Sequence, residues 1–434
     1  MPAEPAAKHD HQTLKFPPKF LWGAASAAFQ VEGNNKYSDW WHWEQEAQKP
    51  SFRSGTACDH YHLFNLDFGL AQGLGHNSHR LSIEWSRIEP KEGEFDQHEI
   101  EHYQQVLKSL KDKGMTVMLT LHHFSNPQWI AEMGGWENGE TVKCFVRFVE
   151  RIVPELKDYV DMWITINEPG IYVYMAYLDG SWPPQKTNRW SGLKAYWNMA
   201  QAHKKAYKII HKLVPKARVG MAQNVQSYTT THAHSVLENL AVIFSDLSAN
   251  HAFYYLTKGY HDFLGVNYYF HHRFNDLGPK GKYLEITDVS EQSREVSDLG
   301  WEVYPEGIFD VLEDLSDHIP IYITECGIAS TNDDRRTRFL IHYLQEVYRA
   351  IQSGVDVRGF FYWSLTDNLE WHRGFDPRFG LIDIDYTSQK RTIRESALVY
   401  REIIQHHGIP HHLLKLLAHG LSSAEINKVI ESDK

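Results

Sequence analysis

Short apolar segments recur along the chain, separated by polar and mixed stretches long enough for a helix and a loop. Eight such segments lie at 20–29, 77–85, 116–124, 162–168, 218–224, 263–270, 319–325 and 357–365. Near-continuous apolar runs of this length are typical of parallel strands that are buried on both faces. Their starts are about 40 to 60 residues apart, which is the spacing of successive strands in an α/β barrel.

Helical periodicity fills several of the gaps between these segments. Apolar residues follow helical spacing at 100–113, at 142–156 and at 337–353, and the first and last of these end at Gly114 and Gly354. Eight alternations without a repeated sequence motif predict a (β/α)8 barrel and not a solenoid. A chain of 434 residues is long enough for two or three domains, but barrels of this kind run long as single domains.

We therefore expect an α/β fold, a single (β/α)8 TIM barrel with elaborated βα loops. A disordered N-terminal segment at 1–14, rich in Ala, Pro and His, precedes it. The catalytic barrel occupies 15–405. A C-terminal extension at 406–434 forms one or two amphipathic helices packed on the barrel, to which the sequence assigns no function.

The composition limits the kinds of partner and the cellular compartment that we expect for this protein. The formal net charge is −11 without any block of Lys or Arg, so neither nucleic acid nor an anionic membrane is an expected partner. No apolar run is long enough to span a membrane, and the N-terminus lacks the apolar core of a signal peptide. The three cysteines are widely spaced with no CxxC, which predicts neither a disulfide framework nor structural zinc. We expect a cytoplasmic protein, and an oligomer is compatible with the sequence.

Two acids end strand-like runs far apart in sequence. Glu168 follows the run at 162–167, and Glu325 ends the run at 320–325. Residues that end different parallel strands converge on one rim of a barrel, where such enzymes keep their chemistry. The same rule brings a polar and aromatic set to this rim: Gln30, Glu32, Arg80, His122, His123, Asn167, Asn267, Tyr268, Tyr269, Trp363, Asp367, Glu370 and Trp371. Hydroxyls of a sugar suit the amides and carboxylates, and its C–H face suits an indole.

A carboxyl pair at one rim predicts glycosidic cleavage. One carboxylic acid protonates the leaving oxygen, and a carboxylate acts from the other side of the bond. A separation of about 5–5.5 Å gives direct attack and retention, whereas a wider gap admits water and gives inversion. The sequence leaves these two outcomes open. Arg80 is placed to keep one acid ionised, and an apolar setting favours the protonated form of the other.

The rim residues belong to motifs that together resemble glycoside hydrolase family 1, the retaining β-glycosidases. The resemblance runs from about residue 16 to 404. The motifs are FLWGAA at 20–25, QVEG at 30–33, HRLSIEWSRI at 79–88, TINEP at 165–169, NYY at 267–269, ITE at 323–325 and WSLTDNLEW at 363–371.

The resemblance implies roles for the individual residues. Glu168 is the expected acid/base and Glu325 the expected nucleophile of a double displacement through a covalent glycosyl-enzyme. Arg80 and Tyr269 are expected to support the nucleophile, and Asn167 to hold the 2-hydroxyl of the sugar. The remaining expected substrate contacts are Gln30, His123, Glu370 and Trp371, with Trp363 as a stacking floor and Phe379 closing the pocket wall.

Some positions depart from the family pattern. Cys326 follows the nucleophile where Asn is usual, and Ser125 and Asn126 stand in a segment that usually reads Asp-Leu. We expect Cys326 to affect packing, and the other two to alter the pocket edge and the preferred sugar. Glu370 argues for unphosphorylated sugars because it repels a phosphate. Glu168 argues against thioglucosidase chemistry, in which Gln replaces the acid.

Two other classes of function remain to be weighed. The 27 histidines include adjacent pairs that suggest a metal-dependent hydrolase, but adjacent residues of a strand point to opposite faces, and no HExxH occurs. A sugar receptor without activity typically lacks one of the carboxylates, and both are present here. The expected enzyme is thus a β-glucosidase-type exo-glycosidase that uses no cofactor or metal. Its substrate is a small β-glycoside or short oligosaccharide, a glucoside first and a galactoside or fucoside next, and transglycosylation is compatible with the mechanism.

Overall fold

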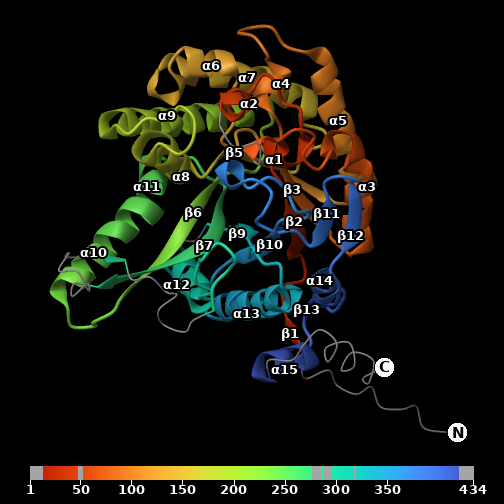
Figure 1. The fold of residues 1–434 in the computed structure, drawn as a ribbon, viewed down its shortest axis with the longest axis vertical. Helices are drawn as coiled ribbons and strands as arrows, with labels where there is room; N and C mark the ends of the chain where they lie inside the picture. Colours follow the sequence, from red (N-terminus) through yellow and green to blue (C-terminus); the bar gives the residue numbers. More distant parts are fainter. Residues whose placement is uncertain (1–12, 47–51, 276–284, 287–294, 317–318, 420–434) are drawn as a thin grey trace, which may run out of the picture.

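The computed structural model describes residues 13–46, 52–275, 285–286, 295–316 and 319–419. Eight parallel strands form a closed ring, because β10 pairs with both β2 and β9, and β6 pairs with both β5 and β7 (Figure 1). The ring confirms the predicted (β/α)8 barrel. Its strands are β2 (Leu21–Ala25), β3 (Ser78–Ser82), β4 (Thr116–Thr120), β5 (Met162–Asn167), β6 (Val219–Thr230), β7 (Phe263–Asn275), β9 (Ile321–Cys326) and β10 (Val357–Trp363).

All eight strands fall on the predicted segments, but their ends differ from the predicted ones, most clearly at β2, β4, β6 and β7. β4 ends at Thr120, four residues earlier than predicted. The first predicted segment, 20–29, divides into β2 and the short helix α1 (Ala28–Glu32), so Gln30 lies on a helix and not directly after a strand. β6 and β7 run further than predicted and stay paired as far as Thr230 and Phe274. Most residues of this outer part are half-buried, with Ser227 of β6 and His271 and Phe274 of β7 buried among them, and the two strands form a ribbon beyond the barrel rim.

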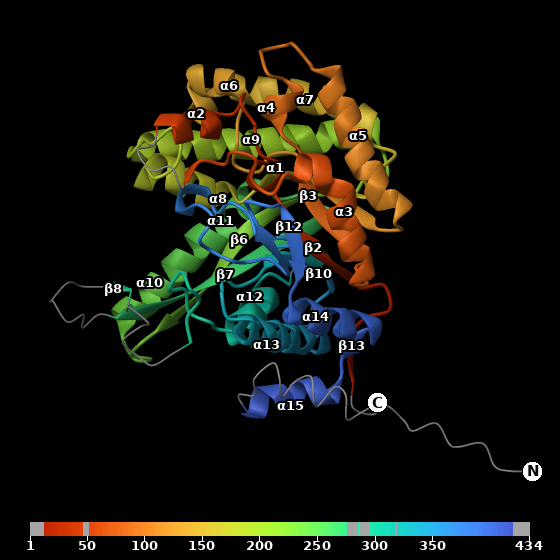
Figure 2. The same ribbon diagram turned by 45° about the vertical axis from the view of Figure 1, so that its right-hand side comes forward.

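Helices cover the outside of the ring (Figures 1 and 2). The predicted helices appear as α5 (Gln97–Asp112), α7 (Glu140–Leu156) and α13 (Asp333–Gln352). Asp96 caps α5 by accepting hydrogen bonds from the backbone N–H groups of His98 and Glu99. The other helices are α2 (Asp39–Glu46), α3 (His60–Gly73), α4 (Trp85–Ile88), α6 (Gln128–Glu132), η2 (Gly135–Glu137), α8 (Pro169–Val173), η3 (Tyr174–Asp179), α9 (Arg189–Leu213), α10 (Val236–Asp246), η4 (Leu247–His251), α11 (Ala252–Leu256), α12 (Glu306–Asp314), η6 (Trp371–Arg373), α14 (Glu395–Gln405) and α15 (His411–His419).

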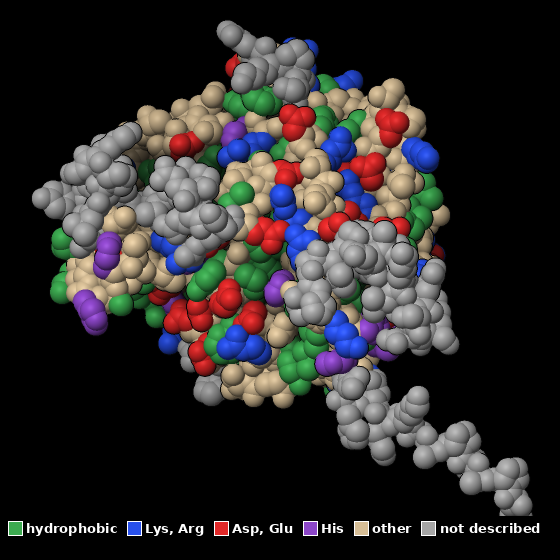
Figure 3. All heavy atoms as spheres, turned by 60° about the horizontal axis from the view of Figure 1, so that its bottom comes forward, with side chains coloured by type: hydrophobic (Ala, Val, Ile, Leu, Met, Phe, Trp, Pro, Cys, Tyr) green, Lys and Arg blue, Asp and Glu red, His purple; other side chains and the backbone are tan. Residues whose placement is uncertain are grey.

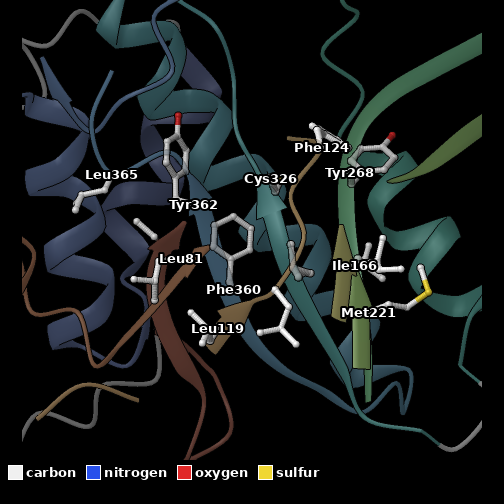
Figure 4. Packing of buried hydrophobic residues seen from close by; sticks show 14 of the residues in the cluster. Leu81, Leu119, Phe124, Ile166, Met221, Tyr268, Cys326, Phe360, Tyr362 and Leu365 are labelled. Carbon is white, nitrogen blue, oxygen red and sulfur yellow. The ribbon is translucent and has the colours of Figure 1, made fainter. Parts of the chain in front are cut away.

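Alternation along the strands divides the core into two clusters. One fills the inside of the ring with residues such as Met118, Ile164 and Phe361. The other lies between the strands and the helices and includes Leu119, Ile166, Phe360 and Cys326 (Figure 4). Cys326 is fully buried in this outer cluster, with Tyr268 and Tyr362 beside the same strand ends.

The two ends of the described chain meet below the barrel. β1 (Leu14–Lys15) pairs antiparallel with β13 (Gly408–Ile409), and α15 follows with Leu413 and Leu416 buried. The predicted boundary at residue 14 thus falls inside β1. Residues 1–12 and 420–434, which hold most of the predicted N-terminal segment and half of the predicted extension, lie outside the described residues. A short hairpin, β11 (Ile382–Asp385) with β12 (Lys390–Ile393), and the two-residue β8 (Glu285–Ile286), complete the fold.

The described surface has no broad field of one charge on the face shown in Figure 3. Acidic and basic side chains lie next to one another there. Within the described residues, no helix has both the length and the apolar character that crossing a membrane requires.

Candidate active site

Irregular pairing at two strand ends directs the two acids inward. Along β9, Ile321 and Ile323 pack in the outer cluster and Tyr322 in the inner one, so strict alternation would send Glu325 outward. The register between β9 and β7 shifts between Ile323 and Glu325, and the shift aims Glu325 into the ring. A similar shift between β5 and β6 precedes Asn167.

Glu325 receives hydrogen bonds on both carboxylate oxygens. The Arg80 guanidinium donates to Oε1 at 2.5 Å, and the Tyr269 hydroxyl donates to Oε2 at 2.8 Å. Arg80 also donates to the Thr324 carbonyl oxygen at 3.0 Å. The guanidinium and the carboxylate are both almost completely buried, so this charged pair is shielded from solvent. Burial raises the pKa of Glu325, while the Arg80 charge and the Tyr269 hydrogen bond oppose that rise.

Glu168 receives neutral donors on a single oxygen. The side-chain amides of Asn267 and Asn224 donate to its Oε1 at 2.7 and 3.2 Å. Its backbone has φ 42° and ψ 59°, in the left-handed region, and Pro169 directly after it begins α8. Burial, and then the nearby charge of Glu325, raise the pKa of Glu168 to about 8. At neutral pH this carboxyl therefore holds its proton.

One hydrogen-bond network connects the two acids. The Arg80 guanidinium, which binds Glu325, also donates to Asn167 Oδ1 at 2.6 Å. Asn267, which binds Glu168, donates to the same Asn167 oxygen at 3.2 Å and accepts from the Thr324 hydroxyl at 2.6 Å. The network spans β3, β5, β7 and β9, so Arg80, Asn167, Glu168, Tyr269 and Glu325 come together as the sequence predicts.

Three buried polar atoms near this network have no protein partner among the described residues. They are Gln30 Oε1, His123 Nδ1 and Glu370 Oε2. Other atoms hold two of these side chains in place. Gln30 Nε2 donates to Asn368 Oδ1 and to the Leu369 carbonyl, and His123 Nε2 lies 3.2 Å from Asn167 Nδ2. Burial, followed by the Glu325 charge, raises the pKa of Glu370 to about 8. Unpaired buried polar atoms are costly, and a ligand rich in hydroxyls would pair them.

Aromatic rings surround these polar groups. The His123 ring stacks between Trp363 and Trp371, with centroids 6.0 and 6.1 Å away. Phe29 stacks on Trp371 at 5.8 Å. Phe379 lies against Tyr269 and Trp301 and shares the inner cluster with Trp363. Phe379 is only 2% exposed, so its ring is packed against its protein neighbours.

Four residues of the predicted rim have other partners. Glu32 pairs with Arg87 and accepts from Tyr103, because α1 turns it away from the ring axis. Asp367 binds Arg394. His122 contacts Asn126 and Trp136, and the Tyr268 hydroxyl donates to a backbone carbonyl.

Ser125 and Asn126, the two residues after His123 that differ from the family pattern, form hydrogen bonds with buried acids. The Ser125 hydroxyl donates to Glu84 at 2.8 Å, and the Asn126 amide donates to Asp39 at 2.8 Å. Burial raises the pKa of Glu84 to about 8 and that of Asp39 to about 7. The departures thus form a polar layer behind the aromatic wall.

Asn224 is a site residue that sequence reasoning missed. It closes the predicted strand at 218–224, and the rule that selected the other strand ends would have selected it too. Trp301 was also missed; it lies in a loop before α12, where no strand end marks it.

Glu168 and Glu325 belong to no group with the spacing of metal ligands in the described part of the chain. Among the described residues, one group of three side chains has the spacing of metal ligands: Asp246, His251 and Asp314. Hydrogen bonds from His251 to Asp246 and Asp314 raise the pKa of the imidazole to about 10, so it holds a proton and forms an ion pair. No hydrogen bond or ion pair connects these three described side chains to Glu168 or Glu325.

Comparison with known proteins places this geometry in a family. The sequence pattern of glycosyl hydrolase family 1 matches residues 12–241 and 245–409. A β-galactosidase from Saccharolobus solfataricus is 31% identical over 89% of this chain and 94% of its own length.

Solved structures of β-glycosidases also resemble this fold. A β-glycosidase from Pyrococcus horikoshii has a TM-score of 0.85 at 36% identity, with 94% of this chain and 99% of that chain covered. A β-glucosidase from Thermotoga maritima in complex with glucoimidazole has a TM-score of 0.86 at 28% identity, with 91% of this chain and 100% of that chain covered. The protein belongs to glycosyl hydrolase family 1.

Proposed function

We propose that this glycosyl hydrolase is a retaining exo-β-glycosidase in which Glu325 is the nucleophile and Glu168 the acid/base. The observation that carries the assignment is the unequal environment of the two acids. Glu325 has a guanidinium and a phenol as donors, which favour its ionised form, whereas Glu168 has two neutral amides and a pKa of about 8. An ionised nucleophile beside a protonated acid is what the first step of a double displacement needs.

The reaction then follows from these protonation states. Glu168 donates its proton to the glycosidic oxygen while a Glu325 oxygen attacks the anomeric carbon. The glycosidic C–O bond breaks, the aglycone leaves as an alcohol, and a glycosyl-enzyme ester forms. Ester formation removes the negative charge of Glu325. Since that charge contributes to the high pKa of Glu168, its loss lowers the pKa of Glu168. Glu168 is then able to accept a proton from the water that hydrolyses the ester.

The unpartnered atoms support a sugar as the bound group. Gln30, His123 and Glu370 would bind hydroxyls of the non-reducing unit, Asn167 the 2-hydroxyl, and Trp363 and Trp371 its C–H face. Phe379 would close the wall. A glucoside is the leading substrate, because the similar Thermotoga maritima protein is a β-glucosidase in complex with glucoimidazole, and a galactoside follows, because the Saccharolobus solfataricus relative is a β-galactosidase. A fucoside, which lacks one hydroxyl of galactose, comes next.

The same pocket argues for an unphosphorylated sugar. A phosphate on the glycone would meet the buried Glu370 carboxyl, and a second acidic group beside a buried carboxyl is costly. The proposed enzyme works without a cofactor. We place it in the cytoplasm, since its three cysteines are free and buried.

A panel of nitrophenyl β-glycosides tests the proposal. Glucoside, galactoside and fucoside are compared by kcat/KM, with the Glu325→Gln variant as the blank, and NMR records the anomer that first appears. A β-anomer supports double displacement, and an α-anomer would show inversion and contradict it. No release from any sugar between pH 5 and 9 would point to a receptor, and loss of activity with a chelator would point to a metal.

A further inference from the structure

The helix α10 carries its apolar side chains on the face that points to solvent. Val236, Leu237, Leu240, Ile243 and Phe244 are between 49% and 74% exposed, whereas Glu238 on the same helix is fully buried. Surface helices normally show the opposite arrangement, with the apolar stripe against the core. In Figure 1 this helix lies at the lower left, alongside the outer part of β6 and far from α3.

The exposed residues follow the spacing of a helix-pairing seam. Val236, Leu240, Ile243 and Leu247 are four, three and four residues apart, and Leu237 and Phe244 flank them at a spacing of seven. Residues at such intervals form one stripe along a helix and pack into a facing helix. The stripe continues from α10 into η4, and the exposed ring of Tyr255 on α11 extends the same apolar region.

Hydrogen bonds fix this segment to the barrel. Asn250 of η4 accepts from the backbone N–H of Gln226 at 2.9 Å and donates to its carbonyl oxygen at 2.8 Å. The Gln223 side chain donates to the Ala249 carbonyl at 2.8 Å. The apolar stripe is therefore presented outward on a fixed support, and its exposure needs a cause other than a loosely attached helix.

The exposed area matches what one half of a small dimer needs. With about 100 Å² for an exposed aliphatic side chain and about 200 Å² for an aromatic one, the seven side chains expose roughly 550 Å². The largest apolar patch of a typical monomer covers about 300–600 Å², and such patches often mark binding sites. Two copies face to face would bury about 1,100 Å² from these side chains alone, which reaches the area of about 1,000 Å² expected of a biological interface.

The charges near the stripe favour a second copy of the chain, and not a lipid membrane, as the surface that covers it. The chain contains no Lys or Arg between Arg218 and Lys258, so the apolar stripe lacks the basic flank of helices that lie on membranes. The two acids of α10 do not belong to the apolar stripe: Glu238 is buried, and Asp246 contacts His251, which it shares with Asp314. Since the stripe itself consists of uncharged side chains, it can face its own copy about a two-fold axis without placing like charges in direct contact.

We propose that α10, η4 and Tyr255 form the interface of a homodimer, in which the stripe of α10 packs against the same stripe of a second chain. Phe244 is its central aromatic anchor. Leu240, in the middle of the stripe, lies beside its own copy whether the two helices run parallel or antiparallel. The interface is independent of the catalytic proposal, because none of its residues contacts Glu168 or Glu325.

Sedimentation velocity from 1 to 100 μM, with the full chain, tests the dimer. Phe244→Asp places a charge in the seam twice, so the dissociation constant should rise at least about 100-fold. Leu66→Asp on α3 is the matched control, since Leu66 is 49% exposed and distant from α10, and it should sediment as the wild type does. Both variants should keep the wild-type far-UV circular dichroism spectrum and aryl-glycoside turnover, which shows that each protomer still folds.

A cysteine variant tests the same contact without a charge. Leu240→Cys should form a disulfide-linked dimer with oxidised glutathione, and Leu66→Cys should not. A wild-type monomer at 100 μM, or equal association of the two aspartate variants, overturns the proposal. Flotation of the wild type with phosphatidylcholine vesicles would assign the stripe to a lipid surface and overturn it as well.

Discussion

The surroundings of Glu325 and of Glu168 differ although both acids end apolar strands of one barrel. A charged guanidinium and a phenol donate hydrogen bonds to the two oxygens of Glu325, and two amides donate to one oxygen of Glu168. Strand position brings each carboxyl to the rim, and the donors that face it determine its protonation. Equivalent places in a fold thus acquire unequal chemistry from side chains on neighbouring strands.

The difference predicts the largest loss of activity at the ionised acid. Glu325→Gln removes the attacking oxygen and the charge that Arg80 balances, so kcat should fall at least about 10⁵-fold on every substrate. Steady-state turnover of an aryl glucoside and of cellobiose measures it. An unchanged melting temperature serves as the folding control. Comparable losses in this variant and in Glu168→Gln on an activated aryl glycoside would contradict the assignment of the nucleophile.

Loss of the protonated acid should depend on the leaving group. Glu168→Gln cannot donate a proton, so hydrolysis of cellobiose should slow by about 10²–10⁴-fold, whereas a dinitrophenyl glucoside should lose less than about tenfold in its glycosylation rate. The activated phenolate leaves without protonation, which is the reason for the contrast. Pre-steady-state release of dinitrophenol separates this step from ester hydrolysis. Equal losses on both substrates would show that Glu168 is not the acid.

The phenol on the nucleophile side should influence the acidic limb of the pH profile. In the wild type, kcat/KM should rise with pH as Glu325 loses its proton and should fall as Glu168 loses its proton near pH 8. The Tyr269 hydrogen bond lowers the pKa of Glu325, so Tyr269→Phe should raise that pKa and move the acidic limb to higher pH. The rate at the optimum should fall about 10²-fold. An acidic limb that stays in place would contradict this contact.

The sequence predicts which residues lie near the rim. It does not predict how the backbone orients each side chain there. Hydrophobic periodicity marked all eight strands, and Arg80 was identified as the partner of one acid because it lies within a strand end. The rule failed for Glu32, which α1 turns toward Arg87. The register shifts beside Glu325 and Asn167 leave no mark in the hydrophobic pattern, because they arise from pairing between strands distant in sequence.

The reversed stripe of α10 shows the same limit on the surface. Helical spacing of apolar residues alone does not tell which way α10 faces, and the structure shows that its apolar side faces outward. Periodicity identifies the face that is buried in some contact, and it does not tell whether the contact is within one chain or between two.

The amide on the acid/base side provides the smallest and most specific test. Asn224 donates to Glu168 Oε1, and this hydrogen bond lowers the pKa of Glu168. Asn224→Ala removes it, so that pKa should rise and the basic limb of kcat/KM should move to higher pH. The rate at the optimum should fall only about tenfold, since Asn267 still holds the carboxyl.

Gln226→Met is the control on the same strand. Its amide donates to Asn224 Oδ1 and not to Glu168, so the basic limb should stay where the wild type has it. The acidic limb should stay in place in both variants, in contrast to Tyr269→Phe. If Asn224→Ala instead moved the acidic limb, the group titrating there would be the one that Asn224 contacts, and the roles of Glu168 and Glu325 would have to be exchanged.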